Sequence, residues 1–114
     1  RIELRSPDSA ANPYLTLAVC LSAGLEGIRE KIEPPQSINA NIFALSEKER
    51  EELHIDQLTG TLLEAVDELE KDTFIQKVLG DHIAGKYIDA KRKEWHEYRS
   101  QVSEWEIQEY LYKY

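Results

Sequence analysis

The stretch DHIAGKYIDAKRKEWHEYRSQV, residues 81–102, decides the fold class because its side chains repeat with the period of a helix. Residues spaced three and four apart lie on one face of an α-helix, which has 3.6 residues per turn. Seven positions share this spacing: Ala84, Tyr87, Ile88, Lys91, Trp95, Tyr98 and Val102. The stretch therefore predicts one long helix with a single, largely apolar stripe.

Capping signals on both sides of this helix predict four more helices. In a capping box, a Ser or Thr and a Glu or Gln three residues later satisfy each other's backbone N–H groups. The pattern occurs at Ser46 with Glu49, Thr61 with Glu64, Thr73 with Gln76, and Ser103 with Glu106. We expect helices at about 47–53, 61–71, 74–80 and 104–112, so that residues 46–114 form a helical subdomain with a C-terminal tail.

The segment before this subdomain predicts a helix at residues 13–32. Asn12 is a favourable N-cap, and Pro13 suits the first helical position, where its missing N–H costs nothing. The stretch YLTLAVCLSAGL is apolar nearly all round, which is typical of a buried helix. Its Cys20 is therefore expected to be a buried free thiol. Residues 33–45, in which Pro34 and Pro35 end the helix, are expected to form a loop.

At the N-terminus the pattern changes to alternation, with charges at Arg1, Glu3 and Arg5 between Ile2 and Leu4. In a strand, alternate residues lie on the same face. We expect residues 1–6 to be the end of a β-strand with one charged and one apolar face. The predicted fold class is mainly α, with this one strand end.

Two interpretations of the charged face remain open at this point, an ion-pair cluster or half of a binding site. Carboxylate oxygens are the ligands that Mg²⁺ and Mn²⁺ prefer, and guanidinium groups bind phosphates and carboxylates through paired hydrogen bonds. Arg1 and Arg5 would lie about 13 Å apart along a strand. That span has room for a nucleotide phosphate at one end and an acidic substrate at the other.

The composition argues against some classes of partner and compartment. The net charge of −8 argues against nonspecific binding to nucleic acid or to anionic membranes. The sequence contains neither a signal peptide nor an apolar run of the roughly 20 residues that a membrane span needs. A single cysteine is consistent with the reducing cytoplasm. The absence of methionine suggests a piece of a longer protein.

Four stretches together resemble the C-terminal part of the catalytic domain of type I bacterial glutamine synthetase. They are RIELRSPDSAANPYL followed by LSAGLEGI, NIFALSEKER, TLLEAVDEL, and the closing WHEYRSQVSEWEIQEYLYKY. The resemblance covers essentially the whole chain. It implies an α+β parent domain that joins ammonia to glutamate at the cost of ATP, through γ-glutamyl phosphate, and a fragment that is inactive alone.

The resemblance also assigns roles to three residues. Glu3 matches a glutamate that binds a divalent metal, Mg²⁺ or Mn²⁺, next to the nucleotide phosphates. Arg5 matches a catalytic arginine that holds the glutamate substrate and the phosphoryl group in transfer. Arg1 matches an arginine that contacts ATP.

Regulation and assembly follow from the same resemblance. Phe43 stands where the branch controlled by adenylylation has the modified tyrosine, so this chain resembles the Gram-positive-like, non-adenylylated branch. That branch implies feedback inhibition and nitrogen-regulatory transcription factors as partners. The family also implies a cytoplasmic dodecamer of two six-membered rings, in which C-terminal segments dock on the opposite ring.

Two other hypotheses remain. One is a sister enzyme that joins glutamate to a polyamine or another amine. The other is a free-standing helical interaction module.

Overall fold

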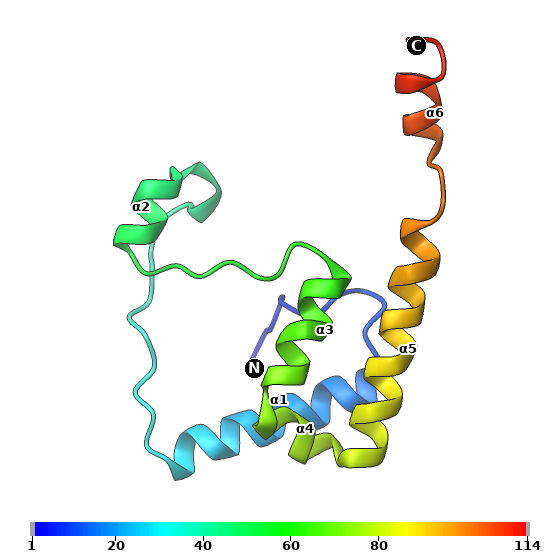
Figure 1. The fold of residues 1–114 in the computed structure, drawn as a ribbon. Helices are drawn as coiled ribbons and strands as arrows, with labels where there is room; N and C mark the ends of the chain where they lie inside the picture. The colour runs from blue at the N-terminus through cyan, green and yellow to red at the C-terminus, as the bar shows by residue number, and fades with distance from the viewer. Residues whose placement is uncertain (1, 114) are drawn as a thin grey trace. The chain divides into compact units, whose positions relative to one another are not determined.

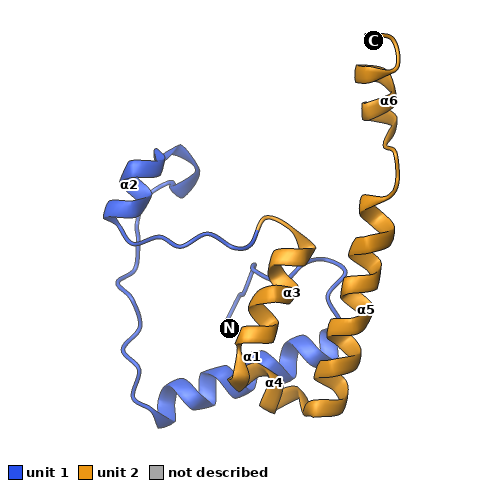
Figure 2. Ribbon diagram, in the orientation of Figure 1, with its two compact units in different colours: residues 1–59 blue, residues 60–114 orange. Residues whose placement is uncertain are grey.

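A computed structural model describes residues 2–113 and shows a mainly helical chain. The chain divides into two compact units, Arg1–Thr59 and Gly60–Tyr114 (Figures 1 and 2). The first contains α1 (Pro13–Arg29), a short 3-10 helix η1 (Ile42–Ala44) and α2 (Glu47–Glu52). The second contains α3 (Leu62–Lys71), α4 (Thr73–Leu79), α5 (Asp81–Arg99) and α6 (Glu104–Tyr110).

The strand end expected at residues 1–6 is not shown by the structure. Residues 2–6 belong to neither a helix nor a strand, and Arg1 lies outside the described residues. A strand exists only where a neighbouring segment accepts and donates its backbone hydrogen bonds. No segment of residues 2–113 pairs with residues 2–6 in this way.

Helix α1 begins where the sequence predicts and ends slightly earlier. The side chain of Asn12 accepts hydrogen bonds from the backbone N–H groups of Tyr14 and Leu15, at 3.0 and 3.2 Å. At the other end, Lys31 has a φ of 53°, and the Ile32 N–H donates back to the Gly27 carbonyl at 2.9 Å. These bonds close a Schellman motif, so the helix stops at residue 29.

The surface of α1 carries a row of exposed apolar side chains within this chain. The row follows the helical period and consists of Tyr14, Leu17, Leu21, Leu25 and Ile28. No residue of α1 is buried. Cys20 is free, as expected, but it is exposed, so the expectation of a buried thiol is wrong within this chain. The sequence pattern identifies an apolar helix, but a partner must be present to cover it.

The segment that follows folds locally around α2. Ser46 and Glu49 form the predicted capping box. The guanidinium of Arg50 donates two hydrogen bonds, of 3.2 and 3.0 Å, to the carbonyl of Leu45, which joins α2 to the turn after η1. A second Schellman motif ends α2, with His54 at a φ of 53°. The expected loop at 33–45 therefore contains one turn of 3-10 helix.

In the second unit, α3, α4 and α5 pack against one another (Figure 1). Val66 of α3 and Ala84 of α5 are its buried side chains, each 2% exposed. Full burial of a valine contributes roughly 1.5–3 kcal/mol. Around them lies a half-buried apolar layer: Leu62, Leu63, Leu69, Phe74, Ile75, Val78, Leu79, Tyr87, Ile88 and Trp95. The stripe predicted for a helix at residues 81–102 is thus buried or half-buried from Ala84 to Trp95 and exposed at Tyr98. The helix ends at Arg99, so Val102 lies beyond it.

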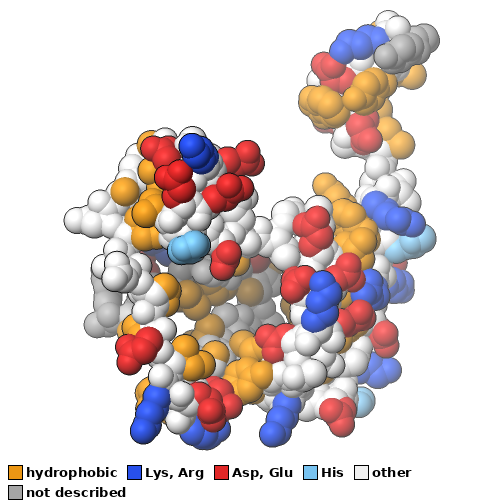
Figure 3. Space-filling view, turned by 60° about the vertical axis from the view of Figure 1, so that its left-hand side comes forward, with side chains coloured by type: hydrophobic (Ala, Val, Ile, Leu, Met, Phe, Trp, Pro, Cys, Tyr) orange, Lys and Arg blue, Asp and Glu red, His pale blue; other side chains and the backbone are white. Residues whose placement is uncertain are grey.

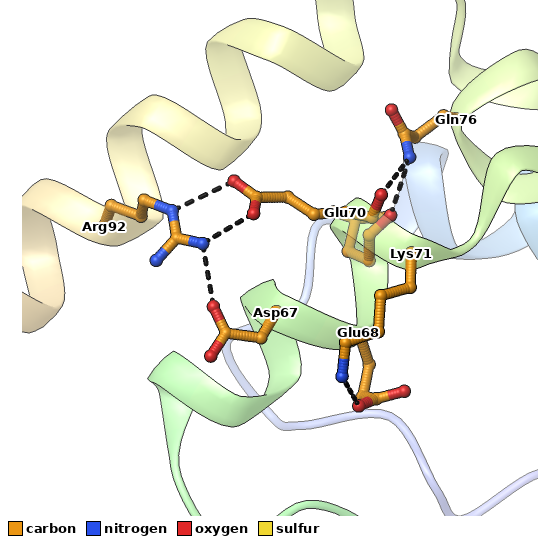
Figure 4. A network of polar contacts seen from close by, with 7 residues as sticks. Asp67, Glu68, Glu70, Lys71, Gln76 and Arg92 are labelled. Carbon is orange, nitrogen blue, oxygen red and sulfur yellow. Dashed lines mark hydrogen bonds and ion pairs between the residues drawn. The ribbon is translucent and has the colours of Figure 1, made fainter.

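One predicted capping box is wrong, and its residues have other roles. Thr73 is the first residue of α4, and the cap is Asp72, whose side chain accepts from the Ile75 N–H at 2.9 Å. The side-chain amide of Gln76 donates to the carbonyls of Leu69 and Glu70, at 3.1 and 2.9 Å (Figure 4). Only Asp72 separates the two helices, so this turn has no room for a box at Thr73, and Gln76 instead caps the end of α3.

The other two boxes of this unit form as predicted. Thr61 and Glu64 begin α3, and Ser103 and Glu106 begin α6. Figure 1 shows α6 beyond the C-terminal end of α5, away from α3 and α4. Within residues 2–113, no helix is both long enough and apolar enough to cross a membrane.

Candidate functional site

The charged N-terminal segment is the candidate site, and the structure brings two of its three predicted residues together. Nε of Arg5 donates to Oε1 of Glu3 at 2.6 Å. The side chains are 85% exposed for Arg5 and 50% exposed for Glu3. Arg1, the predicted nucleotide ligand, lies outside the described residues. The structure therefore shows the ion pair. Because both side chains remain accessible to solvent, they can also take part in binding.

Glu3 fits one part of a divalent metal site. Its carboxylate is the kind of oxygen donor that Mg²⁺ and Mn²⁺ select. Mg²⁺ needs six ligands, and several of them are commonly waters. Among residues 2–113, no three His, Cys, Asp or Glu side chains come close enough to one another to hold a metal ion. Glu3 can thus contribute one protein ligand, and the described residues do not supply a complete set of His, Cys, Asp or Glu ligands around it.

A turn connects this segment to α1 and sets where the two charges lie relative to the helix start. Oδ1 of Asp8 accepts from the Ala10 N–H at 2.7 Å, and the Asp8 carbonyl accepts from the Ala11 N–H at 3.0 Å. Asn12 then caps α1 directly after this turn. Sequence reasoning assigned no role to Asp8. The available signal was Pro7-Asp8, since Pro and Asp are favoured residues in turns of this kind.

A second cluster of charges lies between α3 and α5, centred on Arg92 (Figure 4). Its Nε donates to Oε1 of Glu70 at 3.0 Å, while Nη2 donates to Oε2 of Glu70 and Oδ1 of Asp67, both at 2.7 Å. The hydrogen bond from Arg92 lowers the pKa of Glu70 and raises that of Arg92. The guanidinium is occupied by these two carboxylates, so the cluster links the helices and is a structural contact.

The other charged side chains of residues 2–113 are distributed over the helix surfaces. In the face shown in Figure 3, acidic and basic side chains are interspersed over the surface, with several acidic ones together in one part. Many are paired within one helix, such as Glu26 with Arg29 at 2.6 Å and Glu68 with Lys71 at 2.7 Å. Exposed pairs of this kind within one helix are typical of a solvated helix face.

Aromatic side chains gather at the C-terminal end. The rings of Trp105 and Tyr110 meet edge to face with centroids 5.9 Å apart. Both remain more than half exposed, and so do Leu111 and Tyr112. Large exposed aromatic groups of this kind are typical of residues that bind a partner.

Comparisons with known proteins give the same family for nearly the whole chain. The family model described as "Glutamine synthetase, catalytic domain" matches residues 1–110. The glutamine synthetase of Clostridium saccharobutylicum is 48% identical over all of this chain and 26% of that protein. The glutamine synthetase of Methanosarcina mazei is 51% identical over 97% of this chain and 25% of that protein. This chain therefore spans about a quarter of the length of the curated relatives it matches.

Structural comparison agrees. The solved structure of "Apo GmaS without ligand" superposes with a TM-score of 0.79 at 39% identity, over 96% of this chain and 25% of that one. Neither of the two other hypotheses, a glutamate–polyamine ligase and a free-standing helical module, is favoured by these matches.

Proposed function

Because this chain belongs to the family of the glutamine synthetase catalytic domain, we propose that it is the C-terminal quarter of a glutamate–ammonia ligase. The full-length enzyme makes glutamine from glutamate, ammonia and ATP through γ-glutamyl phosphate, and this part alone is inactive. One observation carries the proposal: the family match includes the opening R-x-E-x-R motif and continues to residue 110.

In this proposal the N-terminal segment supplies three side chains to the active site. Glu3 is one carboxylate ligand of Mg²⁺ or Mn²⁺, and the bound cation supplies positive charge beside the transferring phosphoryl group. Arg5 holds the glutamate substrate and the phosphoryl group, for which its planar guanidinium is suited. Arg1 contacts the nucleotide. The closeness of Glu3 and Arg5 supports a shared site.

The rest of the catalytic domain completes the structure around this chain. We infer that residues 1–6 form a strand when the α+β domain supplies a neighbouring strand. We also infer that the remaining domain covers the apolar row of α1. The exposure of that row supports this inference, because a stable soluble domain rarely leaves so continuous an apolar surface in water.

Regulation in this proposal follows the non-adenylylated branch. Phe43 lies on η1 and is 98% exposed. By the resemblance, it stands where the other branch carries the modified tyrosine. A phenyl ring has no hydroxyl to receive AMP. Control then rests on feedback inhibition and on nitrogen-regulatory transcription factors in the cytoplasm.

The metal assignment is tested by Glu3→Gln in the full-length enzyme. Glutamine keeps the shape of the side chain but loses its charge, so we expect a folded oligomer that has lost most of its ligase activity at ordinary Mg²⁺ concentrations. The matched control is Glu33→Gln, which removes the same charge from the exposed loop and should retain activity. Near-normal turnover of Glu3→Gln would contradict the proposed role.

A further inference from the structure

A turn made by Asp8 joins the charged N-terminal segment to α1. Oδ1 of Asp8 accepts from the Ala10 N–H at 2.7 Å, and the Asp8 carbonyl accepts from the Ala11 N–H at 3.0 Å. Asn12 follows directly and caps α1. Side chains of the Asp type close such turns by accepting from a backbone N–H two residues on. All of these bonds lie within residues 8–15, so we expect the same turn in the full-length enzyme.

The chain between this turn and Arg5 has little backbone freedom. Only Ser6 and Pro7 separate Arg5 from Asp8. The ring of a proline holds its own φ near about −65°, and it disfavours the helical conformation for the residue before it. The place of Arg5 relative to α1 therefore depends on the geometry that Asp8 sets at the turn.

We propose that Asp8 is a positioning residue of the ligase, which acts by holding Arg5 in place relative to α1. In the proposed function the rest of the domain covers α1, so this helix is the fixed element from which the turn projects the segment. A displacement of about 1 Å in a substrate-binding side chain can lower a rate about 100-fold, because the reacting groups must stay aligned. This inference rests on the proposed function, in which Arg5 holds the glutamate substrate and the phosphoryl group.

Steady-state kinetics of three variants of the full-length enzyme test this role. Asp8→Ala loses the acceptor, and Asp8→Glu keeps the charge but places the carboxylate one methylene farther along the side chain. Both should raise KM for glutamate and lower kcat, so that kcat/KM falls roughly tenfold or more. Asp8→Asn keeps an acceptor oxygen at the same position and should retain the kinetics of the unmodified enzyme. The matched control is Asp56→Ala, which removes the same charge from an exposed loop and should change neither constant.

Light scattering checks that each variant keeps the particle mass of the unmodified enzyme, and Asp8→Glu carries the comparison if Asp8→Ala does not fold. Unchanged kinetics in Asp8→Glu overturn the inference. Asp8→Asn as impaired as Asp8→Glu also overturns it, because the charge and not the turn would then matter. A lower kcat with KM for glutamate unchanged does the same, since loss of folded enzyme alone gives that result. Each of these outcomes leaves the proposed function standing, which fails instead if Glu3→Gln keeps near-normal turnover.

Discussion

Arg92 joins α3 to α5 by binding two carboxylates that are three residues apart on α3. Because Asp67 and Glu70 lie one helical turn apart, both can reach the same guanidinium. The hydrogen bond from Arg92 lowers the pKa of Glu70 below its ordinary value of 4.5. The ionised carboxylate of Glu70 on α3 thus helps to hold Arg92, and with it α5, in place.

The first prediction concerns pH. Since the pKa of Glu70 is lower in the folded than in the unfolded state, its contribution to stability is present above pH 4.5 and is lost as the pH falls through the folded value. Glu70→Gln should therefore lower the thermal midpoint of this chain at pH 7, and the difference should be smaller at pH 3. In an Arg92→Gln background the same substitution should have little effect at either pH. A difference that persists unchanged at pH 3 would count against this role.

At the scale of elements, the turn between α3 and α4 gives Asp72 two roles. It is the C-cap residue of α3 and the N-cap residue of α4. We predict that Asp72→Ala lowers the free energy of unfolding of the second unit by about 1 kcal/mol, the usual cost of losing an N-cap. Thr73→Ala is the matched control and should change little, because its hydroxyl is not the cap. Urea titration followed by tryptophan fluorescence compares them, and equal losses would refute the assignment.

Each of the helices α1 and α2 is followed by a residue in a strained backbone conformation. Lys31 and His54 both adopt a positive φ of 53°, which costs free energy for any residue with a Cβ. Glycine is the usual residue at this position of a Schellman motif. Lys31→Gly and His54→Gly should each stabilise their helix by about 0.5–1 kcal/mol.

Lys31→Ala provides the control for that third prediction. It removes the lysine side chain but keeps the Cβ, so it should not stabilise α1. Thermal unfolding followed by circular dichroism at 222 nm measures the three variants. A stabilisation by alanine as large as that by glycine would show that backbone strain is not the cause.

At the scale of the whole molecule, the exposed aromatic residues in and after α6 indicate contact with another subunit. Trp105, Tyr110 and Leu111 remain more than half exposed although their side chains are large and mainly apolar. We predict that the full-length enzyme forms the dodecamer that the family resemblance implies, and that truncation after Val102 leaves each subunit folded but weakens this assembly on dilution. Light scattering measures the particle mass. Trp105→Ala combined with Tyr110→Ala should act in the same direction, and a truncated enzyme that resists dilution as well as the parent would exclude this role.

The sequence alone determined the features that depend on neighbouring residues in the chain. It predicted the first helix from Asn12 and Pro13, three capping boxes from hydroxyl–glutamate pairs, and the long helix from its period. Each of these rests on hydrogen bonds or spacing within a few residues, so no other part of the molecule is needed. The N-terminal motif likewise indicated the family before any geometry was known, and the family match confirms it.

Only the tertiary structure decided which residues meet across elements. The pairing of Arg92 with Asp67 and Glu70 joins positions more than twenty residues apart, and no local pattern encodes it. Only one residue, Asp72, separates α3 from α4, which leaves no room for the predicted box at Thr73. Asp72 is therefore the N-cap residue of α4. Burial also depends on partners, which is why an apolar helix with a cysteine lies exposed within this chain. A strand at residues 1–6 needs a neighbouring strand for the same reason, since its backbone hydrogen bonds are made between segments and not within one.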